Sequence, residues 1–288
     1  MKTKHFSVLI ILMLLTGCTN KMDQINWKFW EYFTNDTQEE ITDEPEEKNP
    51  EEKPTEENSE DEKNNTSQPE IPEKNENQYV LEASYFTVLN DEKVIENVDN
   101  MLVLVNKQQS LPADYVPKDL TIPDVPFSFE GDYEKKYMRE EAARALEQLF
   151  QAAQAENVEI FAVSGYRSYE TQYGIYNSYI KKWGEKKTNA VSAIPGHSEH
   201  QTGLSMDISS RSAALDLTEE FGKTPEGKWV KEHASKHGFI IRYPEEGEPI
   251  TGYQYEPWHL RYVGKEVAAY IHENNLTLEE FFDRAVKQ

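Results

Sequence analysis

Apolar residues recur at helical spacing in the stretch from Tyr137 to Glu156. One face of that stretch collects Ala142, Ala145, Leu146, Leu149, Phe150 and Ala153. Such spacing predicts an amphipathic helix whose apolar stripe packs on a core. Further helices are predicted from Ser168, a typical N-cap residue, from Thr218 to His237 with Gly238 closing it, from Lys265 to Glu273, and from Leu278 to Val286.

Short apolar runs predict buried strands at residues 100–106, 159–164 and 239–243. Residues 111–126 contain four prolines and predict an extended segment that wraps over the domain. The helices and short strands follow one another in irregular order, without an internal repeat. This order favours an α+β fold, a single compact domain with a small antiparallel sheet flanked by helices.

The first residues follow a different pattern. Lys2 and Lys4 precede an apolar run, residues 8–15, that is too short to span a bilayer as a helix. This pattern predicts a signal peptide over residues 1–17. Leu15-Thr-Gly-Cys18 resembles a bacterial lipobox, so we expect Cys18 to carry a lipid anchor; the alternative is an incidental cysteine. Because Cys18 is the only cysteine, the chain cannot form an intramolecular disulfide.

Residues 18–78 are predicted to form a disordered acidic tether. Between Glu39 and Glu76 the chain carries sixteen acidic residues and four lysines, a net charge of −12. This is about half of the formal net charge of −23 for the whole chain. A segment so charged and so poor in apolar residues cannot form a core. The net charge therefore says little about a substrate, and no basic stripe indicates nucleic acid. We expect the folded domain at residues 79–288, which is long enough for one core.

Four residues of this domain supply the chemistry of a hydrolytic metal site. His200 and Asp207, followed about fifty residues later by His259, offer two imidazoles and a carboxylate, and Glu256 is a spare carboxylate. Three protein ligands with one open position are typical of catalytic zinc, with the spare carboxylate as general base. We expect His200 and Asp207 on a strand–turn–strand that bends at Gly203. A single histidine is commonly only a satisfied polar residue, so this prediction depends on the joint pattern.

That joint pattern resembles a known family. Ser198-x-His200-x-x-Gly203-x-Ser205-x-Asp207 resembles the Ser-x-His-x-x-Gly-x-Ala-x-Asp signature of zinc D-Ala carboxypeptidases. These enzymes are related to the vancomycin-resistance enzymes VanY and VanX and form the M15 peptidase family. The chain departs from the signature at Ser205, where the family has Ala, which adds a hydroxyl that needs a partner.

Two further motifs extend the resemblance over residues 102–264. Glu256-Pro-Trp-His259 is similar to the family's Glu-x-x-His, and Ser164-Gly-Tyr-Arg167-Ser-x-x-x-Gln172 is similar to its upstream arginine motif. All three motifs occur in the family's order and spacing. The extended N-terminal wrap resembles the branch of VanY and the LD-carboxypeptidases.

The resemblance implies a role for each matching residue. His200, Asp207 and His259 would bind zinc, and Glu256 would be the catalytic base. Arg167 would stabilise the oxyanion of the tetrahedral intermediate, as a fixed guanidinium beside a developing negative charge can do. A surface salt bridge is the alternative role for Arg167.

Substrate contacts are implied for Gln172, Ser198 and Tyr243, which match positions that contact the peptide in the carboxypeptidase branch. Their neutral donors suit a terminal carboxylate. Tyr243 ends an apolar strand, so a tyrosine at the edge of the core is the alternative there.

These observations predict a zinc carboxypeptidase that removes the C-terminal D-alanine from peptidoglycan stem peptides. We expect a monomer, lipid-anchored on the outer face of a Gram-positive cell membrane and without a nucleic-acid partner. Three alternatives stay open at this point: an L,D-carboxypeptidase acting on tetrapeptide stems, an endopeptidase that cuts cross-links, and a non-catalytic wall-binding lipoprotein.

Overall fold

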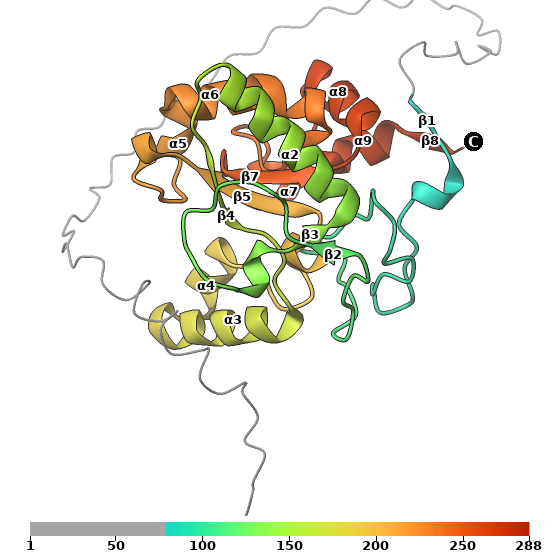
Figure 1. The fold of residues 1–288 in the computed structure, drawn as a ribbon. Coiled ribbons are helices and arrows are strands. Elements are labelled where there is room, and N and C mark those ends of the chain that lie inside the picture. Colours follow the sequence, from blue (N-terminus) through green and yellow to red (C-terminus); the bar gives the residue numbers. More distant parts are fainter. Residues whose placement is uncertain (1–78, 288) are drawn as a thin grey trace, which may run out of the picture. The chain divides into compact units, whose positions relative to one another are not determined.

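The computed structural model describes residues 79–287 (Figure 1). The strands are β1 (Val80–Leu81), β2 (Leu120–Thr121), β3 (Met138–Arg139), β4 (Phe161–Ser164), β5 (Ser205–Ser209), β6 (Phe239–Ile241), β7 (His259–Tyr262) and β8 (Val286–Lys287). The α-helices are α2 (Glu140–Ala155), α3 (Tyr169–Trp183), α4 (Glu185–Val191), α5 (Glu220–Lys223), α6 (Pro225–His233), α7 (Glu248–Thr251), α8 (Lys265–Glu273) and α9 (Leu278–Arg284). Single 3₁₀ turns are η1 (Ala83–Tyr85), η2 (Glu134–Lys136), η3 (Glu199–Thr202), η4 (Arg211–Ala213) and η5 (Ala234–His237).

A four-stranded sheet of order β4-β5-β7-β6 forms the centre, and every neighbouring pair in it is antiparallel. Helix α2 crosses in front of this sheet in Figure 1, while α3 and α4 lie below it and α8 and α9 lie to the upper right of β7. Strands β2 and β3 form a small antiparallel pair, and β1 pairs with β8 in parallel. The predicted mixture of helices with an antiparallel sheet is confirmed.

The two faces of the sheet differ in chemistry because side chains alternate along a strand. Met206 and Ile208 of β5, with Leu260 of β7, belong to the main apolar core together with the buried face of α2. The intervening residues Asp207 and His259 therefore lie on the opposite face, where they are direct partners in the β5–β7 register. The sheet thus separates an apolar core from a polar face that brings a carboxylate and an imidazole together.

Helix α2 confirms the amphipathic pattern, although it begins three residues later than predicted, after β3. Its buried residues are Ala142, Ala143, Ala145, Leu146, Leu149, Phe150 and Ala153. Glu140 and Glu141 lie in the first turn, where acidic side chains complement the helix dipole. The helix ends where Asn157 adopts a φ of 61° and the Val158 amide donates to the Ala153 carbonyl. Each leucine buried in this way contributes about 1.5–3 kcal/mol.

The strand predicted at residues 100–106 is wrong, although the burial behind that prediction is correct. Val103 and Val105 are fully buried, but no strand pairs with them. The Arg261 guanidinium donates instead to the carbonyls of Met101 and Val103, at 3.2 and 2.8 Å. A buried side chain thus satisfies backbone groups that a neighbouring strand would otherwise bind.

The helix predicted at residues 218–237 is broken into α5, α6 and η5. Pro225 has no amide hydrogen and stands at the start of α6, where none is needed. The Thr224 hydroxyl caps α6 by accepting from the Gly227 amide at 3.0 Å. Gly238 ends η5 with a φ of 86°, so the predicted closing glycine is confirmed.

The predictions for residues 1–78, including the signal peptide, Cys18 and the acidic tether, lie outside the described residues. Within residues 79–287, no helix combines the length and the apolar character that crossing a membrane requires.

Candidate active site

His200, Asp207 and His259 come together in a buried cluster, with 6, 4 and 3% of their surface exposed. His200 Nε2 lies 3.3 Å from Asp207 Oδ2, and His259 Nδ1 lies 2.9 Å from Asp207 Oδ1. The two imidazole rings are perpendicular, with centroids 4.9 Å apart. One ligand atom from each residue lies within 4.8 Å of the others, so the three can hold one metal ion.

A hydrogen bond on the outer side of the His200 ring decides which of its nitrogens faces the cluster. His200 Nδ1 donates to the Gly165 carbonyl at 2.8 Å, which leaves Nε2 facing Asp207. Two imidazoles and a carboxylate, with His200 oriented by this outer hydrogen bond, form a ligand set that zinc prefers. Burial acts to raise the pKa of Asp207, but His200 and His259 together outweigh it and lower the pKa, so the carboxylate is ionised.

His200 lies in the 3₁₀ turn η3, so the predicted strand–turn–strand is wrong. Gly203 does provide the bend, since it ends η3 with a φ of 67° before β5 carries Asp207. The η3 turn brings His200 Nε2 to 3.3 Å from Asp207 Oδ2 of β5. The spacing between His200 and Asp207 is therefore that of a 3₁₀ turn followed by a strand.

Glu256 lies in the turn that leads into β7, beside the metal cluster. Its amide donates to the Tyr243 carbonyl at 3.0 Å, and its carbonyl accepts from the His259 amide at 3.1 Å. Burial raises the pKa of Glu256 to about 7, and Asp207 adds to this rise while His259 and Arg167 oppose it. A carboxyl with such a pKa can accept and return a proton near neutral pH, as a general base must.

Both terminal nitrogens of the Arg167 guanidinium donate hydrogen bonds that hold the side chain at the site. Its Nη1 donates to Gln172 Oε1 at 2.9 Å, and its Nη2 donates to Ser164 Oγ at 3.3 Å. The Arg167 amide also donates to the His200 carbonyl at 3.2 Å. Arg167 thus bonds to its neighbours within the site, and the alternative of a surface salt bridge does not describe it.

Gln172 is buried in helix α3, where its whole amide group is engaged. While Oε1 accepts from Arg167, Nε2 donates to Ser192 Oγ at 3.2 Å and to the Ala193 carbonyl at 2.6 Å. These contacts orient Arg167 and tie it to the segment that follows α4. The N-cap predicted for this helix is confirmed, since Ser168 Oγ accepts from the Thr171 amide.

Ser198 and Tyr243 are also buried close to the cluster. Ser198 precedes η3 and is two residues from His200. The Tyr243 ring lies 5.2 Å from the His259 ring and 4.6 Å from the Tyr253 ring, measured between centroids. Burial raises the pKa of Tyr243 well above its ordinary value, so its hydroxyl stays protonated and can donate a hydrogen bond.

Sequence reasoning missed a buried network of charges around Glu199. Its carboxylate accepts from Arg242 Nε and from Arg261 Nη1, both at 2.7 Å, and lies 3.4 Å from His259 Nε2. Arg242 also makes two bonds to Glu279 of α9, at 2.8 and 2.7 Å. The signal in the sequence is an arginine inside an apolar strand, because a buried guanidinium needs an anionic partner.

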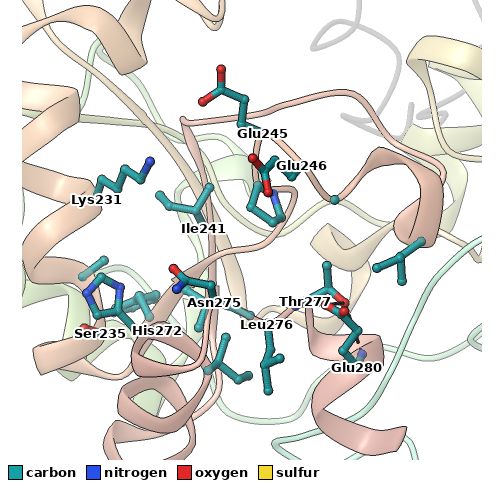
Figure 2. A pocket seen from close by; sticks show the side chains of 17 residues that line it. Lys231, Ser235, Ile241, Glu245, Glu246, His272, Asn275, Leu276, Thr277 and Glu280 are labelled. Atoms are coloured by element: carbon teal, nitrogen blue, oxygen red, sulfur yellow. Dashed lines mark hydrogen bonds between the residues drawn. The ribbon is translucent and has the colours of Figure 1, made fainter.

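A cavity of about 480 Å³ lies elsewhere, beside β6, and none of the three cluster residues lines it. In Figure 2, Ile241 and Leu276 lie among the polar side chains of Lys231, Glu245 and Asn275. We therefore place the active site at the metal cluster and not in this cavity.

Comparison with known proteins agrees with the geometry. The profile of the VanY family, described as D-alanyl-D-alanine carboxypeptidase, matches residues 135–265, which include Arg167, Glu256 and all three cluster residues. YodJ of Bacillus subtilis (strain 168), named as a carboxypeptidase, is 54% identical over 216 residues, which cover 73% of this chain and 78% of YodJ. The chain belongs to the VanY family of carboxypeptidases.

Solved structures of VanY-type enzymes have the same fold. LdcB, an LD-carboxypeptidase, superposes with a TM-score of 0.71 at 53% identity, covering 73% of this chain and 100% of LdcB. A vancomycin-resistance D,D-pentapeptidase VanY in complex with Zn(II) superposes with a TM-score of 0.52 at 33% identity, covering 63% of this chain and 98% of that one. The chain is thus a peptide hydrolase of a zinc-dependent family, and its donor set fits that metal.

Proposed function

We propose that this chain is a zinc carboxypeptidase that removes the C-terminal D-alanine from peptidoglycan stem peptides. His200, Asp207 and His259 are its zinc ligands in this proposal. The observation that carries it is the buried cluster of these three residues, whose ligand atoms lie within 4.8 Å of one another, with Glu256 beside it. The match of residues 135–265 to the VanY family supports the same substrate class.

Zinc, when bound, supplies a Lewis acid that makes a water molecule more acidic and polarises the scissile carbonyl. Glu256 takes the proton of the attacking water, because its raised pKa makes its carboxylate a sufficient base near neutral pH. Glu256 then returns that proton to the nitrogen of the leaving D-alanine. Arg167, fixed by its bonds to Gln172 and Ser164, stabilises the negative charge that develops on the carbonyl oxygen.

Substrate binding is assigned to Ser198, Tyr243 and Gln172. Ser198 is two residues from His200, and the Tyr243 ring lies 5.2 Å from the His259 ring, so hydroxyls of both residues are available to donate to a terminal carboxylate. Gln172 contributes to binding mainly through Arg167, because its own amide group is already engaged by that residue, Ser192 and Ala193.

An L,D-carboxypeptidase is the second candidate, acting on the tetrapeptide stem and not on the pentapeptide stem. The observation that favours it is the similarity to LdcB, which is higher in identity and in TM-score than the similarity to the zinc-bound VanY. Both candidates use the same residues and differ only in the bond that lies over the metal.

Incubation with zinc and with purified pentapeptide or tetrapeptide muropeptides tests the proposal through the D-alanine that is released. Release from the pentapeptide alone defines a D,D-carboxypeptidase, and release from the tetrapeptide alone an L,D-carboxypeptidase. The Glu256→Gln variant, loaded with zinc, is the matched control and should release none. Cleavage within cross-linked dimers instead would indicate an endopeptidase, and binding without cleavage a wall-binding protein.

Anchoring is proposed from the sequence alone. Residues 1–17 are the signal peptide, Cys18 is lipidated, residues 18–78 are the tether, and residues 79–288 are the catalytic domain. The protein would then act as a monomer on the outer face of a Gram-positive membrane. The Cys18→Ser variant should lose metabolic labelling by a fatty acid and move from the membrane fraction to the medium; membrane retention of the unlabelled variant would contradict the anchor.

A further inference from the structure

Lys107 is a cation close to the metal cluster that the proposed reaction does not use. The Tyr243 ring lies 5.2 Å from the His259 ring, and the Tyr253 ring lies 4.6 Å from the Tyr243 ring, measured between centroids. The Lys107 ammonium lies 4.4 Å from the centroid of the Tyr253 ring. Tyr253 is buried and Lys107 is exposed, so this row of rings ends in a positive charge that solvent can reach.

A second series of contacts joins Lys107 to the other proposed substrate hydroxyl. Asn106 precedes Lys107, and its carbonyl accepts from His197 Nδ1 at 2.7 Å. His197 in turn precedes Ser198. Ser198 and Tyr243 are the residues whose hydroxyls are assigned to the terminal carboxylate, and Lys107 is connected to both through one or two intervening residues. Its ammonium therefore lies on the side of the site where that carboxylate would bind.

Two contacts hold the Lys107 side chain in place before a substrate binds. Its Nζ donates to the Asn189 carbonyl of α4 at 3.2 Å. Its Cδ lies against Gly252, where an added Cβ would be 3.1 Å away. A lysine that is already held in position loses less conformational entropy when it binds a ligand. An ammonium has three N–H groups, so hydrogens remain for a ligand beside the one that Asn189 accepts.

A carboxypeptidase needs a cation at this place. The enzyme has to distinguish a free terminal carboxylate from the carbonyl of a peptide or an amide. The hydroxyls of Ser198 and Tyr243 can donate to either group, so they do not make this distinction. Arg167 bonds Gln172 and is assigned to the carbonyl oxygen under attack. Hydrogen bonds between an ammonium and a carboxylate are stronger than those to a neutral acceptor, so Lys107 can make the distinction.

We propose that Lys107 binds the free C-terminal carboxylate of the stem peptide and thereby makes the enzyme specific for chain ends. It is a specificity-determining residue that acts together with the hydroxyls of Ser198 and Tyr243. This inference deepens the proposed function and rests on it, because the carboxylate has to lie where these two residues are. The preference for a charged terminus is assigned to Lys107 alone.

Two peptides that differ only at the C-terminus test the inference. One is the stem peptide that the zinc-loaded enzyme cleaves, and the other is its C-terminal carboxamide; released D-alanine or D-alaninamide gives kcat/KM for each. Lys107→Met removes the charge and keeps the apolar stem. On the carboxylate we expect it to lose about 10- to 100-fold in kcat/KM, mainly through KM, because a hydrogen bond to a charged group is lost. On the carboxamide no such bond is lost, and the change should stay below about threefold.

Two further variants separate the charge from the contacts of the side chain. Lys107→Gln can still donate to the Asn189 carbonyl but carries no charge, so it should show the same loss as Lys107→Met. Lys118→Met, at an exposed lysine, is the matched control for the loss of one positive charge. It should leave the ratio of kcat/KM between the two peptides unchanged.

Melting temperature and zinc content are measured for every variant. Equal losses on both peptides, or a loss in Lys107→Met that Lys107→Gln restores, would overturn the inference, because Lys107 would then only support Tyr253 or α4. A folded, zinc-loaded Lys107→Met with the wild-type preference would overturn it as well. If the zinc-loaded wild type releases D-alanine from no stem peptide, the proposed function itself fails; if it does release D-alanine and the Lys107 variants keep its preference for the carboxylate, only this inference fails.

Discussion

Replacing Glu256 with Gln should stabilise the metal-free protein while it abolishes turnover. Burial raises the pKa of Glu256 from 4.5 to about 7, so the folded protein binds this proton more tightly than the unfolded chain does. Holding the ionised carboxylate in the fold above that pKa costs about 3 kcal/mol, at about 1.36 kcal/mol per pH unit. This figure is an upper bound, because the side chain is partly exposed to water.

The sign of the effect follows from proton linkage. The free energy of unfolding of the wild type contains a term that falls as pH rises from 4.5 to about 7 and is constant above that range. Glutamine does not titrate, so the difference between variant and wild type should grow by about 2–3 kcal/mol between about pH 5 and pH 8. All other titrating groups are common to both proteins and cancel in this difference.

Urea unfolding of both proteins in the presence of a chelator, at several pH values in that range, measures the difference. Glu232→Gln, at an exposed glutamate of α6, is the matched control for the loss of a carboxylate. A difference that stays constant with pH, or a wild type that gains relative stability as pH rises, would refute the reasoning. Turnover of Glu256→Gln with zinc bound should fall below detection, because removal of a general base alone costs about 10²- to 10⁴-fold.

Further outcomes follow from the same geometry. Release of D-alanine should decline as pH falls below a limit at or under about pH 7, since the base Glu256 is then protonated and a bound cation can only lower its pKa from the value of about 7. Arg167→Lys should lower kcat by about 10²- to 10³-fold with zinc content unchanged, because an ammonium group cannot keep both guanidinium bonds. Gly227→Ala should lower the melting temperature by several degrees, because the new Cβ would lie 2.0 Å from the Phe221 carbonyl oxygen, whereas Gly174→Ala meets no atom within 4 Å and should not. Chelation of the metal should lower the melting temperature of the wild type, and added zinc should restore it, because ligand binding stabilises the folded state.

Local patterns predicted those parts of the fold in which one segment determines its own structure. Helix α2 carries its whole apolar face within one stretch, and Ser168 caps α3 with its own side chain. The helix from Lys265 to Glu273 has the predicted bounds. The metal cluster could be predicted because its residues recur as a motif that resembles a known family.

Errors occur where a distant partner decides the structure. Residues 100–106 have the apolar pattern of a strand, but the carbonyls of Met101 and Val103 bind the side chain of Arg261, which comes from far along the chain. The network around Glu199 was missed for the same reason, because a pairing between separate segments leaves no periodic signal. Pro225, by contrast, is a local signal in the sequence, because a proline inside the predicted helix at 218–237 indicates a break there.

Asp207 and His259 occupy facing positions on the adjacent strands β5 and β7, and this arrangement affects how such enzymes can diversify. Sheet register, and not the length of chain between the two residues, sets the distance between them; a slip of one residue would turn one of them to the opposite face. The long connection that holds α5, α6, β6 and α7 can therefore gain or lose residues without changing the spacing of the ligands. Tyr243, a proposed substrate contact, lies in that connection, so substitutions there can alter substrate preference while the metal cluster stays unchanged.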